Sequence, residues 1–342
     1  FTIWMTTSCN FKCKYCYVDK QNITMSSDTA HNVVDYICDV MKDKSDENIN
    51  IIFHGGEPFY NYRQIIFIYN ELNRRLKNTM TFSVTTNGSF FNEDIKKFLQ
   101  NSNVELCVSL DGNKKSNDSN RQTRNGCSSY EMVIDFLEKN GYEYKDYGTY
   151  SDESCGKNIK IRMTVNTLNV KDLYKNYLHI NQLGYDIISF APDEGDKWTK
   201  KDLDIYKTNF HLILEYLKNK DIELYKYYRE NIKNFYFMTI SPCSGGAKSL
   251  HVSVDGTLYP CMLAVGKNKY KIGDIYDGID IEKLKEIHKY SLEDNITCKN
   301  CGIKNNCRNN RCKIINDIRT HNFLFAYPIS CAFQHINYEE LF

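Results

Sequence analysis

The sequence predicts an α/β protein, in which an open, partial TIM-like (β/α)6 barrel precedes a small cysteine-rich domain. Short β-rich runs alternate with amphipathic helical patterns along the first 190 residues, which is typical of βαβ units around a parallel sheet. We recognise six such units, whereas a closed barrel has eight. Many of the 14 cysteines lie near the end of the chain.

The predicted strands are short apolar runs rich in β-branched residues, and they are Thr2–Thr6, Ile49–His54, Met80–Thr85, Val104–Leu110, Ile159–Val165 and Ile187–Ala191. Between them, apolar residues recur with helical spacing, which predicts helices over Ser27–Lys42, Arg63–Lys77, Glu93–Gln100, Ser129–Asn140 and Val170–Leu183. Tyr142–Asn158 is polar and without periodicity, so it is expected to be a surface loop.

The composition changes after a mostly helical connection over Thr199–Phe237. From Pro242 onward the chain is rich in glycine, cysteine and short strand-like runs. His251–Cys261 is expected to form a hairpin, because alternating residues flank Asp255-Gly256. We therefore predict one domain over residues 1–235 and a second over residues 236–342.

Composition limits the classes of function. The chain has 342 residues, 42% of them hydrophobic, and a formal net charge of +1. This balance gives no reason to expect a nucleic-acid partner. No apolar run approaches the roughly 18 residues of a membrane span. The cysteines are bunched at short spacings, which favours metal ligation over disulfides and a reducing, cytoplasmic location.

Cys9, Cys13 and Cys16 stand in the run CNFKCKYC, directly after the first predicted strand. Three thiolates from one loop can hold three irons of a 4Fe–4S cube and leave the fourth iron open. A zinc site would normally need a fourth ligand. The run resembles the signature of the radical SAM (S-adenosylmethionine) superfamily. That resemblance implies SAM binding at the open iron, reductive cleavage to a 5′-deoxyadenosyl radical, and hydrogen abstraction from a substrate.

Further motifs lie where that family places them. Gly55-Gly56-Glu57-Pro58 resembles the GGEP motif that meets the SAM amino group; glycines permit close backbone approach, and Glu57 can pair with an ammonium. The runs TTNG and SLDG, which end the third and fourth predicted strands, resemble positions near the SAM ribose and carboxylate. The resemblance also implies SAM contacts from Thr85, Ser109 and the backbone of Tyr15. Arg121 is expected to pair with the SAM carboxylate, and Arg124 is the competing choice for that role.

The roles of two arginines cannot be decided from the sequence. Arg121 could instead be a solvated surface arginine. Arg162 lies on a strand that should point into the barrel, but it could be a structural ion pair.

The C-terminal cysteines follow a second pattern. Twelve residues, Gly256 and four residues separate Cys243 from Cys261, and the run Cys298-x2-Cys301-x5-Cys307-x4-Cys312 precedes Cys331. This resembles the SPASM domain of radical SAM peptide and protein modifiers, apart from the four-residue gap before Cys312, where three is usual.

The resemblance implies two auxiliary 4Fe–4S clusters, and hence three clusters in the chain. The outer one is expected on Cys298, Cys301, Cys307 and Cys331, and the inner one on Cys243, Cys261 and Cys312. Because Ser244–Pro260 contains no cysteine, one iron of the inner cluster is expected to be open or held by a ligand that the sequence does not identify. Two zinc knuckles are the alternative.

The other cysteines carry weaker expectations. Cys38 and Cys107 lie in helix and strand patterns and are expected to be buried core residues. Cys127 and Cys155 lie in apparent loops, where either could contact substrate.

The expected function is maturation of a ribosomal peptide. The runs YPCMLAVG from Tyr259 and YKIGD from Tyr270 resemble those of thioether-forming maturases, which join a cysteine sulfur to a carbon. A thiolate of the substrate could bind the open iron, and no obvious general base is present or needed.

Several alternatives remain. The first alternative is carbon–carbon or ether crosslinking of a peptide, which is close to thioether formation. Formylglycine formation by a sulfatase maturase is the next, although such enzymes tend to carry an aspartate where this chain has Met262. Small-molecule radical chemistry and electron carriage without catalysis are the others.

The partners implied are a precursor peptide and an electron donor such as flavodoxin or ferredoxin. Relatives often have an N-terminal leader-binding domain. This chain opens on its first predicted strand, so leader recognition is expected from a separate protein, from the Tyr142–Asn158 loop or from the barrel mouth.

Overall fold

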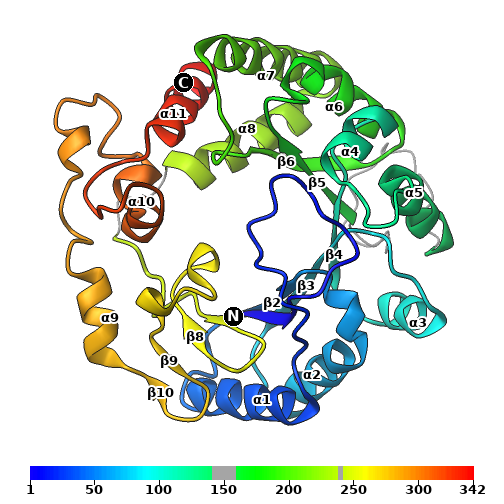
Figure 1. The fold of residues 1–342 in the computed structure, drawn as a ribbon, viewed down its shortest axis with the longest axis vertical. Coiled ribbons are helices and arrows are strands. Elements are labelled where there is room, and N and C mark those ends of the chain that lie inside the picture. The colour runs from blue at the N-terminus through cyan, green and yellow to red at the C-terminus, as the bar shows by residue number, and fades with distance from the viewer. Residues whose placement is uncertain (141–158, 238–241) are drawn as a thin grey trace.

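The computed structural model describes residues 1–140, 159–237 and 242–342. The predicted loop over Tyr142–Asn158, with Cys155, lies outside the described residues. Six parallel strands form an open arc, which confirms the partial barrel (Figure 1). They are β1 (Thr2–Thr6), β2 (Ile49–Gly55), β3 (Met80–Thr86), β4 (Glu105–Ser109), β5 (Ile159–Val165) and β6 (Asp186–Pro192).

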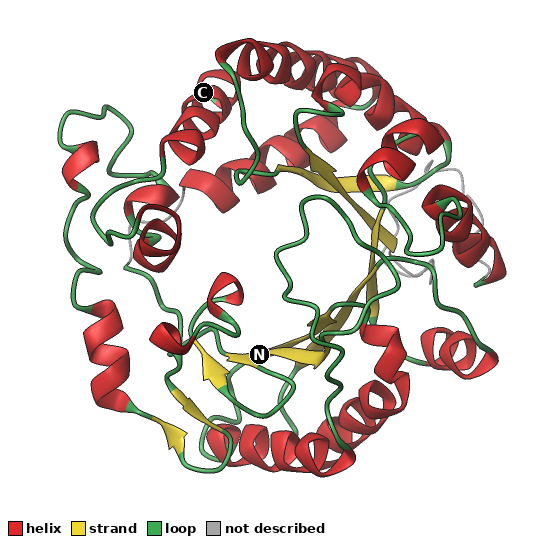
Figure 2. Ribbon diagram, viewed as in Figure 1, coloured by secondary structure: helices red, strands yellow, loops and turns green. Residues whose placement is uncertain are grey.

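Helices surround the arc on its outer side (Figure 2). The barrel helices are α1 (Ser27–Met41), α2 (Tyr62–Arg75), α3 (Glu93–Asn101), α4 (Lys114–Asn120), α5 (Ser129–Lys139), α6 (Leu173–Gln182), α7 (Lys200–Lys220) and α8 (Ile222–Phe237). Each predicted helix is present within a few residues of its expected bounds. Helix α4 was not predicted, because its sequence KKSNDSN has no apolar residue from which a helical period could be read.

The strands place one side-chain face outward and the other inward. Along β2, Ile49, Ile51 and Phe53 are buried, and the alternate residues, among them His54, are more accessible. Because side chains alternate across a strand, the buried set packs under the helices and forms the core. The other set lines the interior of the barrel, where the site must be sought.

The C-terminal region closes the open side of the arc. Strand β7 (His251–Val252) pairs in parallel with β1, and β8 (Leu258–Tyr259) pairs antiparallel with β7. The predicted hairpin is therefore present, with Gly256 in the left-handed region at φ +86°. The sheet runs in the order β6-β5-β4-β3-β2-β1-β7-β8.

Short elements complete this region. They are β9 (Gly273–Asp274), β10 (Gly278–Ile279), α9 (Ile281–His288), α10 (Lys313–Thr320) and α11 (Pro328–Leu341). Helix α11 packs back onto α7, where Lys207 Nζ lies 2.6 Å from Glu339 Oε2 and the rings of Trp198 and Phe333 meet edge-on at 4.8 Å. The domain boundary near residue 236 stays a prediction. Among the described residues, no helix is long and apolar enough to cross a membrane.

Candidate active site

The loop that carries Cys9, Cys13 and Cys16 follows β1 and lies across the middle of the ring of helices (Figure 1). It has almost no regular structure, so other contacts must hold it. Its backbone runs against the segment after α4: Lys12 N donates to Gln122 O at 2.7 Å and Lys14 N to Asn120 O at 3.0 Å. The segment that bears Arg121 is therefore a structural partner of the cysteine loop.

The three thiols share one electrostatic environment. Burial raises the pKa of Cys13 to about 11; the charge of Arg121 opposes this, and charges on Asp111, Cys16 and Cys9 add to it. Cys9 is buried, and its sulfur accepts from Phe11 N at 3.4 Å and Asn87 Nδ2 at 3.5 Å. Thiols whose negative charges raise one another's pKa fit a cationic iron cluster, which stabilises thiolates.

The two glycines of the GGEP turn have a packing role that the sequence did not reveal. A Cβ on Gly55, at φ +142°, would lie 2.2 Å from Thr6 O, and one on Gly56 would lie 2.2 Å from Ser8 O. Gly56 N donates to Thr6 O and Glu57 N to Ser8 O, both at 2.8 Å. The turn is therefore pressed against the backbone that leads into the cysteine loop.

Glu57 is fully buried, and Pro58 behind it begins a 3-10 turn over Pro58–Asn61. The Glu57 carboxylate accepts from Thr86 Oγ1 at 2.7 Å, Asn87 N at 2.7 Å and Phe59 N at 3.2 Å. Burial raises its pKa to about 7, against the effect of these donors. Glu57 thus joins the ends of β2 and β3, and its contact with a SAM ammonium stays a prediction.

Arg121 is buried and ion-paired, so the surface alternative for it is wrong. Its Nε lies 3.3 Å from Asp111 Oδ1, and its guanidinium carbon lies 5.4 Å from the centre of the Tyr15 ring. Burial is the largest single effect and lowers the pKa of Arg121, but the negative charges of Asp111, Tyr15 and Cys13 together raise it overall. Tyr15 donates to Asp111 Oδ2 at 2.7 Å.

Asp111 is therefore the centre of this group, and it also accepts from Thr164 N at 2.9 Å. Sequence reasoning named it only as part of the SLDG run. The signal was an acidic residue directly after a strand that ends in a glycine turn.

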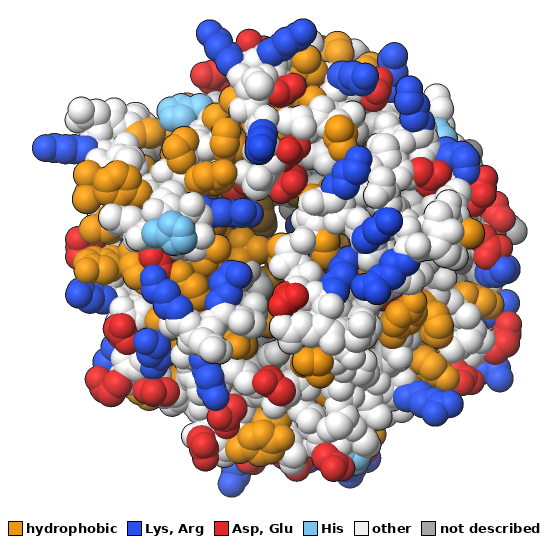
Figure 3. Space-filling view, viewed as in Figure 1, with side chains coloured by type: hydrophobic (Ala, Val, Ile, Leu, Met, Phe, Trp, Pro, Cys, Tyr) orange, Lys and Arg blue, Asp and Glu red, His pale blue; other side chains and the backbone are white. Residues whose placement is uncertain are grey.

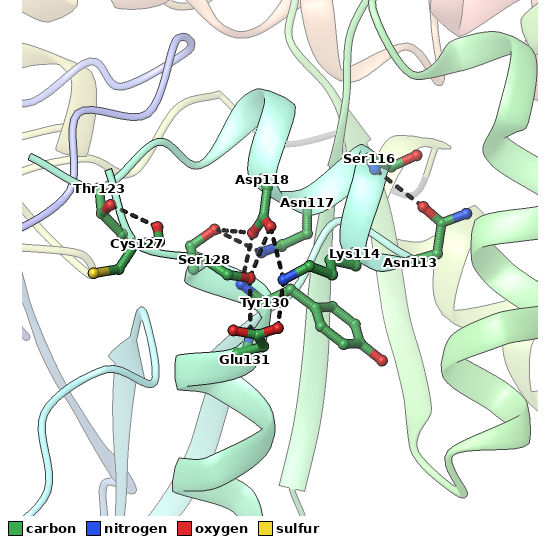
Figure 4. Close-up of polar contacts among 11 residues, drawn as sticks. Asn113, Lys114, Ser116, Asn117, Asp118, Thr123, Cys127, Ser128, Tyr130 and Glu131 are labelled. Atoms are coloured by element: carbon green, nitrogen blue, oxygen red, sulfur yellow. Dashed lines mark hydrogen bonds and ion pairs between the residues drawn. The ribbon is translucent and has the colours of Figure 1, made fainter. Parts of the chain in front are cut away.

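A polar network supports the segment between α4 and α5 (Figure 4). Asp118 accepts from Ser128 Oγ at 2.7 Å, Ser129 Oγ at 3.0 Å and Tyr130 N at 2.8 Å. These bonds satisfy donors at the start of α5, where unpaired N–H groups are otherwise left. The network fixes the ends of the segment that carries Arg121.

Arg124 and Cys127 lie farther along the same segment. Arg124 lines a cavity of about 320 Å³ together with Cys9, Asn10 and Tyr60. Cys127 is exposed, and its sulfur points away from the polar network (Figure 4). The structure thus places Arg124 beside Cys9 and Arg121 beside Cys13, so each remains a candidate for the SAM carboxylate.

Thr85 and Ser109 both lie toward the carboxyl ends of neighbouring strands. Thr85 pairs in register with Cys107, and Ser109 with Arg162. Cys107 lies half-buried on the interior face rather than in the helix-facing core, so that expectation is wrong. Cys38 is only half-buried and packs against the edge of the core rather than lying within it. Arg162 is exposed on the interior face, with no ion pair to any described residue.

The C-terminal cysteines act on one another electrostatically in two groups, and their assignment to two clusters stays a prediction. Burial raises the pKa of Cys331 to about 12, and charges on Cys298, Cys307 and Cys301 add to the rise.

The second group surrounds Cys312. Burial raises its pKa to about 11, Arg308 opposes the rise, and charges on Cys243 and Cys261 add to it. Cysteines far apart in the sequence are therefore within electrostatic range of one another.

Other side chains near these sets were not found from the sequence. His335 Nε2 lies 3.6 Å from Cys301 Sγ, and the Arg308 guanidinium lies over the Phe235 ring at 4.1 Å. Every cysteine that the structure describes is free of disulfides. Within the same residues, no three or more His, Cys, Asp or Glu side chains are placed to hold one metal ion.

Tyr17 directly follows Cys16 in the N-terminal loop and is 46% exposed. Desolvation of its hydroxyl raises its pKa, and charges on Cys16 and Cys261 add to the rise while Arg162 opposes it. Its hydroxyl is 3.3 Å from His54 Nε2, and the His54 ring lies 5.3 Å from that of Trp4. The barrel interior therefore connects the two cysteine-bearing regions.

Comparisons with known proteins agree with this arrangement. Residues 3–146 match the model of the radical SAM superfamily. The cysteine-type anaerobic sulfatase-maturating enzyme of Clostridium novyi is 25% identical over 90% of this chain and 86% of its own length. The radical SAM cyclopropyl synthase TigE of Paramaledivibacter caminithermalis is 22% identical over 87% of this chain and 63% of its own.

A solved structure shows the same fold over the whole chain. Native anSMEcpe with bound AdoMet and Cp18Cys peptide superposes with a TM-score of 0.75 at 18% identity, and the match covers 100% of this chain and 94% of that one. A radical SAM domain takes SAM and one 4Fe–4S cluster. Residues 3–146 therefore form a radical SAM domain, and the chain is similar over most of its length to radical SAM enzymes that modify peptides and proteins.

Proposed function

We propose that the chain matures a precursor peptide by joining a cysteine sulfur to a carbon of another residue, which makes a thioether. The observation that carries this proposal is the three-membered inner cysteine set. Charges on Cys243 and Cys261 act on Cys312, and charges on Cys16 and Cys261 act on Tyr17. No fourth cysteine follows in Ser244–Pro260. The set thus has one ligand fewer than a cube has irons, next to the barrel interior.

The proposal assigns three 4Fe–4S clusters and one SAM. Cys9, Cys13 and Cys16 hold the first cluster; the outer auxiliary cluster is on Cys298, Cys301, Cys307 and Cys331, and the inner one on Cys243, Cys261 and Cys312. SAM contacts come from Tyr15, Gly55, Gly56, Glu57, Pro58, Thr85, Ser109 and Arg121. Bound there, the first cluster and SAM supply a 5′-deoxyadenosyl radical.

The residues of the chain position the reactants and keep water away. The Asp111–Arg121 pair and the GGEP turn fix the cysteine loop, so that the interior face of the strands meets the peptide. Met262, directly after Cys261, cannot accept a proton. We therefore expect the substrate thiol to lose its proton without a base from this position.

The overall change removes two hydrogens from the peptide. The carbon loses a hydrogen atom, which completes 5′-deoxyadenosine. The thiol loses a proton to solvent. Cleavage of SAM would take one electron from a donor such as flavodoxin or ferredoxin and release methionine, and formation of the C–S bond would give one electron back to a carrier protein. A separate leader-recognition protein remains part of the proposal.

Two alternative products each have an observation in their favour. The similarity to sulfatase-maturating enzymes over most of both chains favours formylglycine formation, and Met262 speaks against it. The similarity to a cyclopropyl synthase favours carbon–carbon bond formation.

Mass spectrometry of candidate precursor peptides, incubated with the reconstituted enzyme, SAM and a reductant, separates the three products. A thioether gives a peptide that has lost two hydrogens and whose cysteine no longer reacts with iodoacetamide. A carbon–carbon crosslink loses the same mass but keeps a reactive thiol, and formylglycine reacts with a hydrazide. Either of the last two results would overturn the thioether proposal.

A further inference from the structure

Arg162 stands in the middle of β5, on the face that lines the barrel interior. Ile159, Ile161, Met163 and Val165 are buried against the helices, and Arg162 alternates with them and is exposed. Its strand neighbour in register is Ser109 at the end of β4. The side chain therefore belongs to the same face as the predicted SAM contacts.

Its charge acts across the interior. The charge of Arg162 adds to the effect of burial in lowering the pKa of His54 to about 4, and it opposes the rise that burial causes at Tyr17 and at Cys107. His54 lies on β2, which is separated from β5 by β3 and β4 in the sheet. These effects agree with the exposed position of Arg162 on the interior face of β5.

Nearby cations are neutralised, whereas Arg162 is not. Lys160, two residues earlier on β5, pairs with Glu105 at 2.8 Å, and Arg121 pairs with Asp111 at 3.3 Å. Within the described residues Arg162 has neither an ion pair nor a hydrogen bond from its guanidinium. With its pKa at about 4, His54 carries no charge at pH 7. Arg162 is therefore an uncompensated positive charge.

We infer that Arg162 binds the carboxylate of an aspartate or glutamate side chain of the substrate peptide inside the barrel, which rests on the proposed peptide-modifying function. The face of the molecule seen in Figure 3 is hollowed near its middle, with Lys and Arg side chains among those around the hollow. A peptide that enters takes water away from Arg162, and an unpaired buried charge is costly. A carboxylate removes that cost, because it matches the guanidinium with two parallel hydrogen bonds.

A panel of synthetic peptides tests the inference. Each peptide has one central cysteine in an Ala/Ser/Gly sequence, and the peptides differ only in whether Asp, Asn or Lys stands at one position near the cysteine. Binding to the reconstituted enzyme with SAM, without reductant, is followed by fluorescence anisotropy. Because the readout is binding, it does not depend on which bond the enzyme later forms.

We expect the wild type to bind the best Asp peptide about tenfold more tightly than its Asn counterpart, which is the size of effect that a hydrogen-bonded charge pair gives. Arg162→Lys should keep the preference for Asp, and Arg162→Glu should transfer it to Lys. Arg63→Glu, which changes charge on the outer helix α2, is the matched control and should change nothing. Iron content and circular dichroism show whether each variant has folded.

Two results would overturn the inference. One is a wild type with no preference for the Asp peptides, whether it binds all peptides or none. The other is an Arg162→Glu enzyme that keeps the preference for Asp but binds SAM more weakly, since this would assign Arg162 to the SAM carboxylate. Failure of thioether formation alone would leave the binding result unchanged.

Discussion

The two cysteine-bearing regions are built in opposite ways. Cys9, Cys13 and Cys16 come from one loop, whereas the C-terminal sets combine residues as distant as Cys243 and Cys312. The N-terminal loop is held in place by contacts with other parts of the barrel, which are the GGEP turn, the segment after α4 and the Asp111–Arg121 pair. The C-terminal region consists mostly of short elements.

This difference suggests a division of labour. We expect the N-terminal site to depend on contacts supplied by the barrel, and the C-terminal sets to depend on the metal clusters that they bind, since metal binding contributes to folding when a site joins distant residues. Changes in the first region should affect SAM cleavage. Changes in the second should spare SAM cleavage and affect the peptide product.

The largest effect is expected from Cys13→Ala. Loss of one of three ligands should remove the first cluster and lower 5′-deoxyadenosine formation by at least about a hundredfold, the upper end of what second-shell changes alone cost. Liquid chromatography of the reaction measures this. Cys127→Ala, at an exposed cysteine outside the sets, is the control, and an equal loss in it would break the assignment.

Cys312→Ala should distinguish the roles of the two cysteine-bearing regions. We expect about four irons fewer per chain, SAM cleavage within a few-fold of wild type, and no crosslinked peptide. Iron analysis and mass spectrometry of the same preparation measure these quantities. Abolished SAM cleavage with the first cluster intact would contradict the division of labour.

Asp111→Asn tests the support of the N-terminal loop. The change leaves Arg121 buried without a counter-charge, which should destabilise the protein by about 3 kcal/mol. Urea unfolding measures the free energy. Asp135→Asn, which breaks an exposed ion pair with Lys139 on α5, should cost far less; similar losses in the two variants would show that the buried pair has no special role.

A matched pair of glycine changes gives the smallest effects. A Cβ on Gly56 would lie 2.2 Å from Ser8 O, and one on Gly245 would lie 2.3 Å from Pro260 O. Each alanine should cost about 2 kcal/mol through overpacking. Gly56→Ala should lower SAM cleavage, and Gly245→Ala should lower only the peptide product.

Gly302→Ala serves as the control for both, because nothing lies within 4 Å of its added Cβ. If Gly56→Ala and Gly245→Ala impaired the same step, the contrast between the regions would fail.

Much of the fold could be predicted because its signals are local. The apolar periodicity of strands and helices predicted the six βα units, and the Asp255-Gly256 turn predicted the hairpin. Helix α4 was not predicted because its polar sequence has no apolar period. A side-chain cap stabilises its start instead, where Asn113 Oδ1 accepts from Ser116 N at 3.0 Å. The pairing of β7 with β1 was also missed, since a two-residue strand carries no signal of its partner.

The site was predicted unevenly for the same reason. Cysteine spacing is visible in a sequence, so the three sets could be proposed. The role of Asp111, the closeness of His335 to Cys301 and the position of Tyr17 depend on how distant segments meet. Cys107 was placed in the core because one strand run does not show which of its faces the helices cover.

The most direct test of the three cysteine sets is the iron and sulfide content of anaerobically reconstituted protein, compared with a variant in which Cys9, Cys13 and Cys16 are all alanine. We expect about twelve irons per chain in the wild type and about eight in the variant, as three cubes require. About four irons in the wild type and none in the variant, with zinc in the C-terminal region, would contradict the auxiliary clusters.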